Sequence, residues 1–299
     1  MVVLVTGANG QLGQALQFIS GNYPEMNFVF CDSAALDITN LENCETVFQE
    51  HQPNFCINAA AYTAVDKAES EPQIAFDVNA NGPENLAITC KKHNTVLLHV
   101  STDFVFDAYF SDGIAYYDRE QRLPLKSNSG LQETDVPFPS GLYGLTKLQG
   151  EQAIEAVWEK HFIIRTSWVY SQFGNNFLKT MLRLASERTS LSVVSDQIGT
   201  PTYAVDLAEV LLKIITSETT TFGIYNFSNE GQCSWYEFAE EIFLQKEVAI
   251  DLQAIPTKSY PTPAKRPAYS VLDKSKIKTT FGVNIKDWKT SLKDCLKHY

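Results

Sequence analysis

Three residues of this chain have the types and the spacing that proton transfer to a carbonyl requires. Tyr143 is followed four residues later by Lys147, so the two side chains share one face of a helix. A free phenol titrates at about 10, and a nearby ammonium favours the phenolate, which eases proton transfer near neutrality. Thr102 follows the apolar run 96–100, so its hydroxyl can polarise a carbonyl beside the tyrosine. These residues predict hydride chemistry in which the phenol gives or takes the proton.

A glycine pattern near the start of the chain predicts a dinucleotide site. Gly7, Gly10 and Gly13 come directly after the apolar run 2–5 and lead into a helical pattern. A strand that enters glycines and then a helix presents backbone N–H groups and the positive end of the helix dipole to a pyrophosphate. This GxxGxxG spacing is a weaker signal than GxGxxG, because many such corners need glycine for packing alone.

Asp32 ends the second apolar run, about 20 residues further on, where a carboxylate can hold a ribose 2′-hydroxyl. Its alternative role is that of a turn former with a solvated carboxylate. With the glycines in place we favour the ribose role. Because Ser33 and not an arginine follows, the pattern favours NADH over NADPH.

The elements that position these residues form an α/β pattern. Short apolar runs alternate with helical patterns, and the predicted strands are residues 2–5, 27–31, 54–57, 96–100 and 162–165. Strands that are almost entirely apolar and separated by helices predict a doubly wound parallel sheet, a Rossmann domain, with right-handed crossovers. Ligands bind at the carboxyl ends of such strands, where Gly7, residues 59–61 and residues 101–103 fall.

We predict two domains. Residues 1–170 form the Rossmann domain that binds NAD(P), and residues 203–227 return to it through a helix at 206–215 and a strand at 223–227. Residues 171–299 are mainly a smaller substrate-binding domain, with helices near 234–247 and 287–296. The polar segment 109–139 is long for a connection, which predicts a surface excursion or a flap near the site.

Composition excludes several function classes. The chain has 299 residues, 44% of them hydrophobic, and a formal net charge of −11. Without clustered Lys and Arg, a nucleic-acid surface is not expected. No apolar stretch reaches the length of a membrane span, and the chain begins with a core strand that leaves no room for a signal peptide, so we expect a cytoplasmic protein.

Cysteine and histidine spacing argues for reduced thiols and against a protein-built metal site. The six cysteines are scattered without a CxxC pair, which favours structural thiols. The five histidines lack HxxxH or HExxH spacing, so no metal ligands are predicted.

Beyond these local patterns, the chain resembles the dTDP-4-dehydrorhamnose reductase family, which belongs to the extended short-chain dehydrogenases/reductases. The resemblance covers nearly the whole chain, in matching order, and rests on residues 58–69 (NAAAYTAVDKAE), 101–106 (STDFVF), 143–147 (YGLTK), 165–170 (RTSWVY), 174–177 (GNNF), 195–202 (SDQIGTPT) and 260–267 (YPTPAKRP). It implies reduction of the C4 keto group of dTDP-4-dehydro-L-rhamnose by NADH or NADPH. The product would be dTDP-L-rhamnose, made in the last step of its pathway for cell-surface polysaccharide.

The resemblance also implies roles for single residues. Tyr143 would donate the proton to the C4 oxygen, Lys147 would be its electrostatic partner, and Thr102 would polarise the carbonyl. The residues expected to line the cofactor are Gly7, Gly10, Gln11, Leu12, Gly13, Asp32, Asp37, Ile38, Ala59, Ala60, Ala61, Tyr62, Thr63, Tyr143 and Lys147. Those expected to face the sugar or the thymidine are Val65, Thr102, Asp103, Phe104 and Trp168, while the guanidinium fork of Arg266 suits the diphosphate.

Several of these residues have structural alternatives. Trp168 could be ordinary core beside the fifth strand, and Arg266 a surface charge in a proline-rich tail. Asp37 also fits the start of a helix.

The chain departs from the family pattern beside the site. Phe104 stands where a tyrosine is common, and the stretch from Phe106 to Tyr143 is longer than usual, with Asp107-Ala108 where a glycine commonly follows the aspartate. Two alternatives therefore stay open: a reductase or epimerase of another nucleotide-linked keto sugar, and a non-catalytic NAD(P)-binding subunit like the one that regulates methionine adenosyltransferase. Some relatives are homodimers with a structural Mg²⁺, and no motif here decides either feature.

Overall fold

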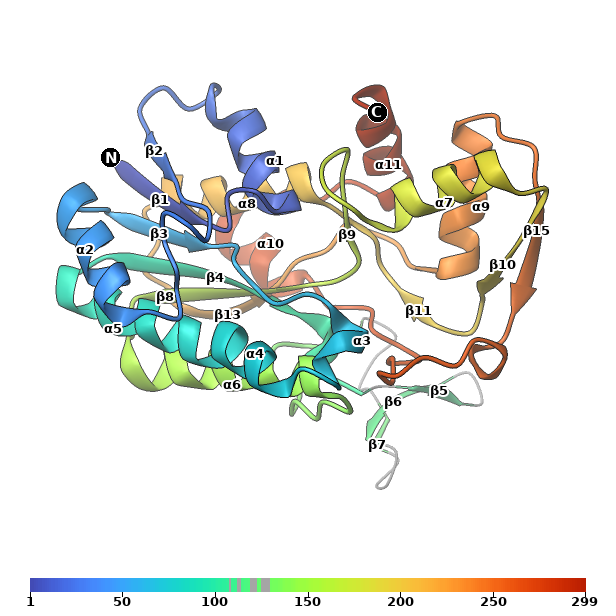
Figure 1. Ribbon diagram of the computed structural model, residues 1–299, viewed down its shortest axis with the longest axis horizontal. Coiled ribbons are helices and arrows are strands. Elements are labelled where there is room, and N and C mark those ends of the chain that lie inside the picture. The colour runs from blue at the N-terminus through green and yellow to red at the C-terminus, as the bar shows by residue number, and fades with distance from the viewer. Residues whose placement is uncertain (108, 112–113, 119–122, 125–129) are drawn as a thin grey trace.

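A parallel sheet of six strands forms the centre of the molecule (Figure 1). The protein is described by a computed structural model that covers residues 1–107, 109–111, 114–118, 123–124 and 130–299. In order across the sheet the strands are β13 (Gly223–Asn226), β8 (His161–Thr166), β4 (Val96–Thr102), β3 (Phe55–Asn58), β1 (Val2–Thr6) and β2 (Asn27–Phe30). All neighbours pair in parallel, which confirms the predicted doubly wound class.

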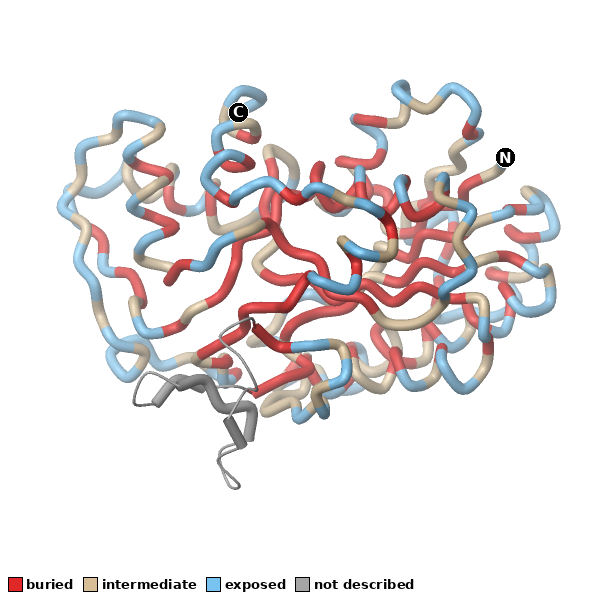
Figure 2. Tube along the Cα trace, turned by 180° about the vertical axis from the view of Figure 1, so that it is seen from behind, coloured by how far each residue is buried: buried red, intermediate tan, exposed pale blue. Residues whose placement is uncertain are grey.

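Helices cover both faces of this sheet. α1 (Gln11–Ser20) packs against α8 (Ala204–Thr216) on one face, and α5 (Gly82–His93) lies between α2 (Leu41–His51) and α6 (Leu142–Val157) on the other (Figure 1). The strands bury side chains on both sides: Val3 and Val5 join the core under α1 and α8, while Leu4 joins the opposite core. Figure 2 shows the inner strands of the sheet as buried, while the edge strand β2 is partly exposed. This double burial is why the strands are almost entirely apolar.

The strand order reverses between β1 and β3. The chain goes from β1 to β2 on one side, then crosses back to β3 and continues outward through β4, β8 and β13. Helical connections leave opposite faces at such a point, and a crevice opens above the strand ends. Gly7 follows β1 and Ala59 follows β3, so both lie at this crevice.

A second group of elements follows β8. β9 (Val169–Tyr170) pairs with β12 (Thr202–Tyr203), β10 (Ser190–Val194) with β15 (Asp251–Ile255), and β11 (Ile198–Gly199) with β14 (Cys233–Ser234). The helices of this part are α7 (Phe177–Glu187), α9 (Trp235–Gln245), α10 (Ser275–Phe281) and α11 (Trp288–Lys297). Three short helical elements, α3 (Val65–Ala68), α4 (Pro72–Phe76) and the π-helical turn Asp77–Asn81, precede α5.

The predicted elements agree with the structure, with one correction that bears on the site. The helices expected at 206–215, 234–247 and 287–296 are α8, α9 and α11, and the strand expected at 223–227 is β13. β4, however, does not stop at residue 100. It runs to Thr102 because Ser101 and Thr102 continue the pairing with β8, so Thr102 belongs to the strand and does not follow it.

The segment 109–139 contains a small antiparallel sheet in its described part. Strands β5 (Tyr109–Ser111), β6 (Ile114–Asp118) and β7 (Leu123–Pro124) pair in that order. They project from the body of the molecule (Figure 1), in agreement with the predicted surface excursion.

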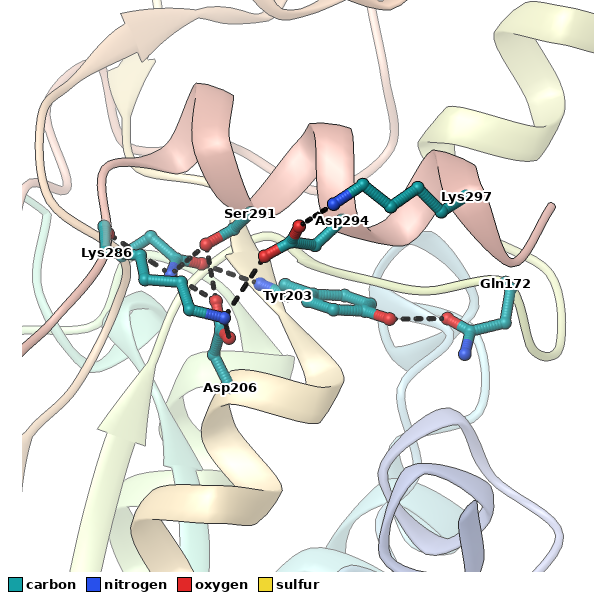
Figure 3. A network of polar contacts seen from close by, with 8 residues as sticks. Gln172, Tyr203, Asp206, Lys286, Ser291, Asp294 and Lys297 are labelled. Atoms are coloured by element: carbon teal, nitrogen blue, oxygen red, sulfur yellow. Dashed lines mark hydrogen bonds and ion pairs between the residues drawn. The ribbon is translucent and has the colours of Figure 1, made fainter. Parts of the chain in front are cut away.

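A network of hydrogen bonds and ion pairs joins the C-terminal helix α11 to the start of α8 (Figure 3). The buried carboxylate of Asp206 accepts hydrogen bonds from Ser291 Oγ and from Asn229 Nδ2 at 2.7 Å, and Lys286 Nζ lies 3.3 Å from its other oxygen. The same Asn229 accepts the backbone N–H of Tyr203 at 2.8 Å. Because the buried carboxylate of Asp206 and the side chains of Asn229 and Ser291 satisfy one another, these contacts can hold α11 against the Rossmann body at little desolvation cost.

The cysteines agree with the prediction of structural thiols, since all six are buried and free. Across the described ranges, no group of three or more His, Cys, Asp and Glu residues could hold a metal ion. In that same part of the chain, no helix combines the length and the apolar character needed to cross a membrane.

Candidate active site

A cavity of about 690 Å³ opens at the carboxyl ends of β1, β3, β4 and β8. Its wall combines the start of α1, the ends of β3 and β4, the first turns of α6 and segments of the C-terminal part. The predicted residues that line it are Gly10, Gln11, Leu12, Ala59, Ala61, Thr63, Val65, Thr102, Asp103, Phe104, Tyr143, Lys147, Trp168 and Arg266. Predicted cofactor, catalytic and substrate residues therefore meet in one place.

A second cavity of about 310 Å³ adjoins the first and shares Asn9, Gly10, Ala59 and Ala61 with it. Its further predicted lining residues are Gly7, Asp32, Asp37, Ile38 and Ala60. Gly13 and Tyr62 line neither cavity. The hydroxyl of Tyr62 donates to Glu71 instead, and its backbone N–H donates to Asn79.

The glycine loop leaves the start of α1 open to a ligand. Gly10 is the N-cap of α1 and supplies no side-chain cap, so the first N–H groups of the helix are not occupied by a capping side chain. Gly7 has a φ of +64°, and a Cβ at Gly13 would lie 2.4 Å from the carbonyl oxygen of Gly7. Gly13 therefore supports the loop from behind, which explains why it does not line the cavity.

Gly13→Ala is expected to weaken binding of a nicotinamide dinucleotide by about 10- to 100-fold, because overpacking against the loop backbone costs about 1–3 kcal/mol. Binding is measured by titrating NADH and NADPH into the protein and following fluorescence. Gly21→Ala is the matched control, since Gly21 ends the same helix with a φ of −62° and nothing within 4 Å of an added Cβ. Equal affinities for the two variants would contradict the role of the loop.

Asp32 is a turn former that also lines the second cavity. Its Oδ1 accepts the N–H groups of Ala34 and Ala35 at 3.0 Å each, and its Oδ2 accepts Asn9 Nδ2 at 3.1 Å. The hydrogen bonds from Ala35 and Ala34 hold the pKa of this carboxyl below its ordinary value. It is thus an ionised turn former in the wall of the second cavity, and free lone pairs remain for a ribose hydroxyl.

Tyr143 and Thr102 both line the larger cavity and are joined by a hydrogen bond. Burial raises the pKa of Tyr143 to about 12, while a hydrogen bond with Thr102 acts in the opposite direction and the charge of Asp103 adds to the rise. The ring of Phe104 packs edge-on against Tyr143 with centroids 5.5 Å apart. In the free protein the phenol is therefore protonated at neutral pH. Burial keeps the proton on the phenol because it disfavours the charged form.

Lys147 is buried one turn further along α6. Its Nζ donates to the carbonyl oxygen of Val100 at 2.8 Å and lies 3.2 Å from His99 Nε2. Burial lowers the pKa of Lys147 to about 8, with the charge of Glu151 acting against the shift. The four-residue spacing predicted that Lys147 shares a helical face with Tyr143. It did not predict that Val100 and His99 on β4 would contact the Lys147 ammonium.

Asp103 lines the cavity, and only part of its carboxyl group is hydrogen-bonded. Burial raises its pKa to about 6, opposed by hydrogen bonds from Ser270 and Thr102. Its Oδ2 is buried and has no hydrogen-bond partner among the described residues. A buried, unpaired carboxyl oxygen is a group that a polar ligand can satisfy.

The two candidate substrate residues furthest along the chain are held in defined orientations. Trp168 has a φ of +47° and stacks on Trp235, with centroids 3.6 Å apart and ring planes at 11°. Arg266 forms a two-pronged ion pair with Asp66 at 3.0 and 2.8 Å. Both side chains are half-buried in the cavity wall, so Trp168 is not simply core and Arg266 is not a free surface charge.

Several lining residues were not predicted. Asn176 binds the side-chain oxygen of Gln11 at 2.8 Å and so joins the glycine-loop helix to α7. The cavity residues that sequence reasoning assigned no role are Asn9, Val100, Ser101, Thr166, Val169, Gly174, Asn175, Asn176, Leu207 and Trp235. The GNNF stretch was a signal for three of them. Trp235 carried none, because its stacking depends on how α9 packs.

Comparison with known proteins assigns the family. A family model described as the RmlD substrate binding domain matches residues 1–299. A dTDP-4-dehydrorhamnose reductase from Aggregatibacter actinomycetemcomitans is 42% identical over 302 residues, covering 98% of this chain and 97% of that protein.

Two solved structures have the same fold over their whole length. The crystal structure of a dTDP-4-dehydrorhamnose reductase from Clostridium acetobutylicum superposes with a TM-score of 0.90 at 39% identity, covering 100% of this chain and 99% of that one. The enzyme of that name from Bacillus anthracis, solved in complex with NADP, has a TM-score of 0.90 at 37% identity and the same coverage. The chain therefore belongs to the dTDP-4-dehydrorhamnose reductase family.

Proposed function

We propose that this chain reduces the C4 keto group of dTDP-4-dehydro-L-rhamnose to dTDP-L-rhamnose, the last step of dTDP-rhamnose biosynthesis, with a reduced nicotinamide cofactor. Relatives that match this chain over nearly their full length are named for this activity. The observation that carries the proposal is the protonated Tyr143 phenol beside Thr102 in the larger cavity. Reduction of a carbonyl consumes a proton, and a phenol with a raised pKa is a donor at neutral pH.

The residues of the two adjoining cavities fit a nicotinamide dinucleotide. The uncapped start of α1 suits the pyrophosphate, and the ionised Asp32 suits a ribose hydroxyl. Asp37, Ile38 and the residues after β3 would hold the adenosine side. When bound there, the reduced nicotinamide supplies the hydride that adds to C4.

The chain's own residues would perform the acid chemistry. The Thr102 hydroxyl orients the C4 oxygen, and Tyr143 gives its proton to that oxygen as it becomes an alkoxide. The Lys147 ammonium stabilises the phenolate that remains. Val65, Asp103, Phe104 and Trp168 would contact the sugar or the thymidine. Arg266, oriented by Asp66, would bind the diphosphate.

We assign residues 1–170 with 203–227 to the cofactor domain and the rest of 171–299 to the substrate domain. The pairing of β13 with β8 and the packing of α8 on α1 support this division. We place the reaction in the cytoplasm, where buried free thiols persist. A homodimer is a further proposal that gel filtration can test.

Mixing the protein with dTDP-4-dehydro-L-rhamnose and NADH or NADPH is expected to remove the absorbance of the reduced nicotinamide and yield dTDP-L-rhamnose. The product is identified by chromatography. If the cofactor binds and other nucleotide-linked keto sugars react while this one does not, the proposed substrate is wrong. If no keto sugar reacts, the chain is a binding protein.

We propose a preference for NADH, because the Asp32 carboxylate would repel a 2′-phosphate. Asp32→Asn keeps the acceptor oxygen of the turn and removes the charge. It is expected to tighten NADPH binding about tenfold and to leave NADH binding within about threefold. Ser33→Ala is the control at the neighbouring position. A wild type that binds NADPH more tightly, and whose preference Asp32→Asn does not change, would contradict this prediction.

A further inference from the structure

A row of buried polar side chains crosses neighbouring strands beneath the two cavities. Thr6 ends β1, Asn58 ends β3, His99 lies in β4, and Lys147 reaches them from α6. Each of the four is at most 1% exposed. Thr6 Oγ1 donates to Asn58 Oδ1 at 2.6 Å, Asn58 Nδ2 lies 2.9 Å from His99 Nδ1, and His99 Nε2 lies 3.2 Å from Lys147 Nζ. The row therefore connects the glycine-loop strand to the lysine of the site.

The direction of these hydrogen bonds is decided at Asn58. Its Oδ1 accepts the backbone N–H of Ala60 at 3.2 Å in addition to the hydroxyl of Thr6. The same N–H also lies 3.2 Å from Thr6 Oγ1. Because a backbone N–H can only donate, it disfavours the amide nitrogen of Asn58 on its side, and that nitrogen then faces His99. The amide nitrogen is a donor, which requires an unprotonated Nδ1 in His99. A neutral His99 therefore carries its proton on Nε2.

This tautomer acts on Lys147. The Nε2–H of His99 points at a nitrogen that also donates to Val100 O at 2.8 Å. An ammonium has three donors and no acceptor, so it cannot accept the Nε2–H. A neutral amine has a lone pair and can. Only the amine form of Lys147 satisfies every donor in the row.

We propose that His99 is a positioning residue that stabilises the neutral amine of Lys147 and thereby sets the pH above which the site loses its ammonium. The inference rests on the proposed reductase function, in which the ammonium stabilises the phenolate left by Tyr143. It adds a residue outside the cavity lining to the control of the proton-transfer step. Asn58 and Thr6 act behind it by locking the tautomer.

The other charged groups around His99 and Lys147 do not stabilise the neutral amine of Lys147 in place of His99. Glu151 on α6 favours the ammonium, but its carboxylate is held in a two-pronged pair by Arg165 from β8. Burial is the main cause that disfavours a charge on His99, followed by Lys147 itself and by His161 from β8. Burial lowers the pKa of His99 and of Lys147, so both groups lose their charge at lower pH than they would in water. Tyr143 and Asp103 lie on the cavity side.

The first test uses the free wild-type protein. Nitrogen-15 chemical shifts of the histidine rings are expected to show His99 as the Nε2–H tautomer at pH 7, with its signals assigned by their loss in His99→Gln. A cationic ring or an Nδ1–H tautomer would overturn the proposal, whatever the activity of the protein.

The second test measures the pKa of Lys147 by NMR of lysine labelled at Cε, with the signal assigned in Lys147→Arg. His99→Met removes the ring donor at similar volume and is expected to raise the Lys147 pKa by about one unit. The alkaline limb of kcat/KM should move upward by the same amount. His99→Gln retains an N–H donor beside Lys147. It is expected to leave the Lys147 pKa and the alkaline limb of kcat/KM within a few tenths of a pH unit of the wild type.

Each result is decisive. An unchanged or lowered Lys147 pKa in folded His99→Met would overturn the proposal, as would a His99→Gln limb that moves as far as that of His99→Met. If His99→Met does not fold, the tautomer in the wild type decides alone. Since both NMR readouts use protein without substrate, failure of the reductase function would leave them interpretable.

Discussion

Replacing Tyr143 by phenylalanine is expected to lower kcat for keto-sugar reduction by about 10²- to 10⁴-fold and to leave cofactor affinity nearly unchanged. The variant loses the hydroxyl that meets Thr102 but keeps the ring that packs against Phe104. Without the phenol, the alkoxide formed at C4 has to take its proton from water. Steady-state kinetics and a fluorescence titration with the reduced cofactor measure the two effects separately.

The matched control is Tyr236→Phe. Tyr236 lies on α9, its hydroxyl pairs with Glu240, and it does not line either cavity. Its removal is expected to leave kcat within about twofold, as for a surface substitution away from the site. A Tyr143→Phe variant with the turnover of the wild type would exclude Tyr143 as the proton donor.

Removing the Glu151 carboxylate is expected to lower the free energy of unfolding strongly, because its partner Arg165 is buried. Its carboxylate receives Arg165 Nε at 3.0 Å and Arg165 Nη2 at 2.6 Å, and both side chains are at most 2% exposed. Arg165 also lies over the ring of Phe106 at 5.1 Å. Glu151→Ala leaves a buried guanidinium without its counter-charge, which costs about 3–5 kcal/mol. Urea unfolding gives the free energy directly.

Two comparisons separate the buried charge from the lost side chain. The double variant Glu151→Leu/Arg165→Met removes both charges and is expected to be more stable than Glu151→Ala. Glu187→Ala breaks a pair with Arg183 in which both side chains are at least half exposed, and it should cost at most about 0.5 kcal/mol. Equal losses in Glu151→Ala and Glu187→Ala would show that burial does not govern this pair.

The proton donor Tyr143 and the buried carboxylate of Glu151 lie on the same face of α6. Tyr143, Lys147 and Glu151 follow one another at four-residue intervals, so one helical face carries the proton donor, the ammonium and the buried carboxylate. Arg165 on β8 fixes the far end of this row, and Val100 and His99 on β4 hold its middle. Loss of Glu151 should therefore also raise the KM or lower the kcat of the fraction that folds.

The fold class and the cofactor end of the site could be predicted because they depend on local patterns. An apolar strand, a glycine turn and a helix follow one another between residues 2 and 20, and this order can be read from the segment itself, although β1 pairs with β3 and α1 packs on α8. The four-residue spacing of Tyr143 and Lys147 likewise places them on one helical face whatever surrounds the helix. Such features are properties of short segments, so the sequence alone determined them.

Only the tertiary structure decided which partners and which charge states these residues have. Arg266 meets Asp66 across 200 positions of the chain, and Trp168 meets Trp235 where α9 closes over β9. The phenol of Tyr143 is neutral because the surrounding elements exclude water, and His99 meets Asn58 and Lys147 because β3, β4 and α6 pack together. Desolvation and hydrogen-bond direction depend on every group packed nearby. A linear sequence specifies those neighbours only through the completed fold.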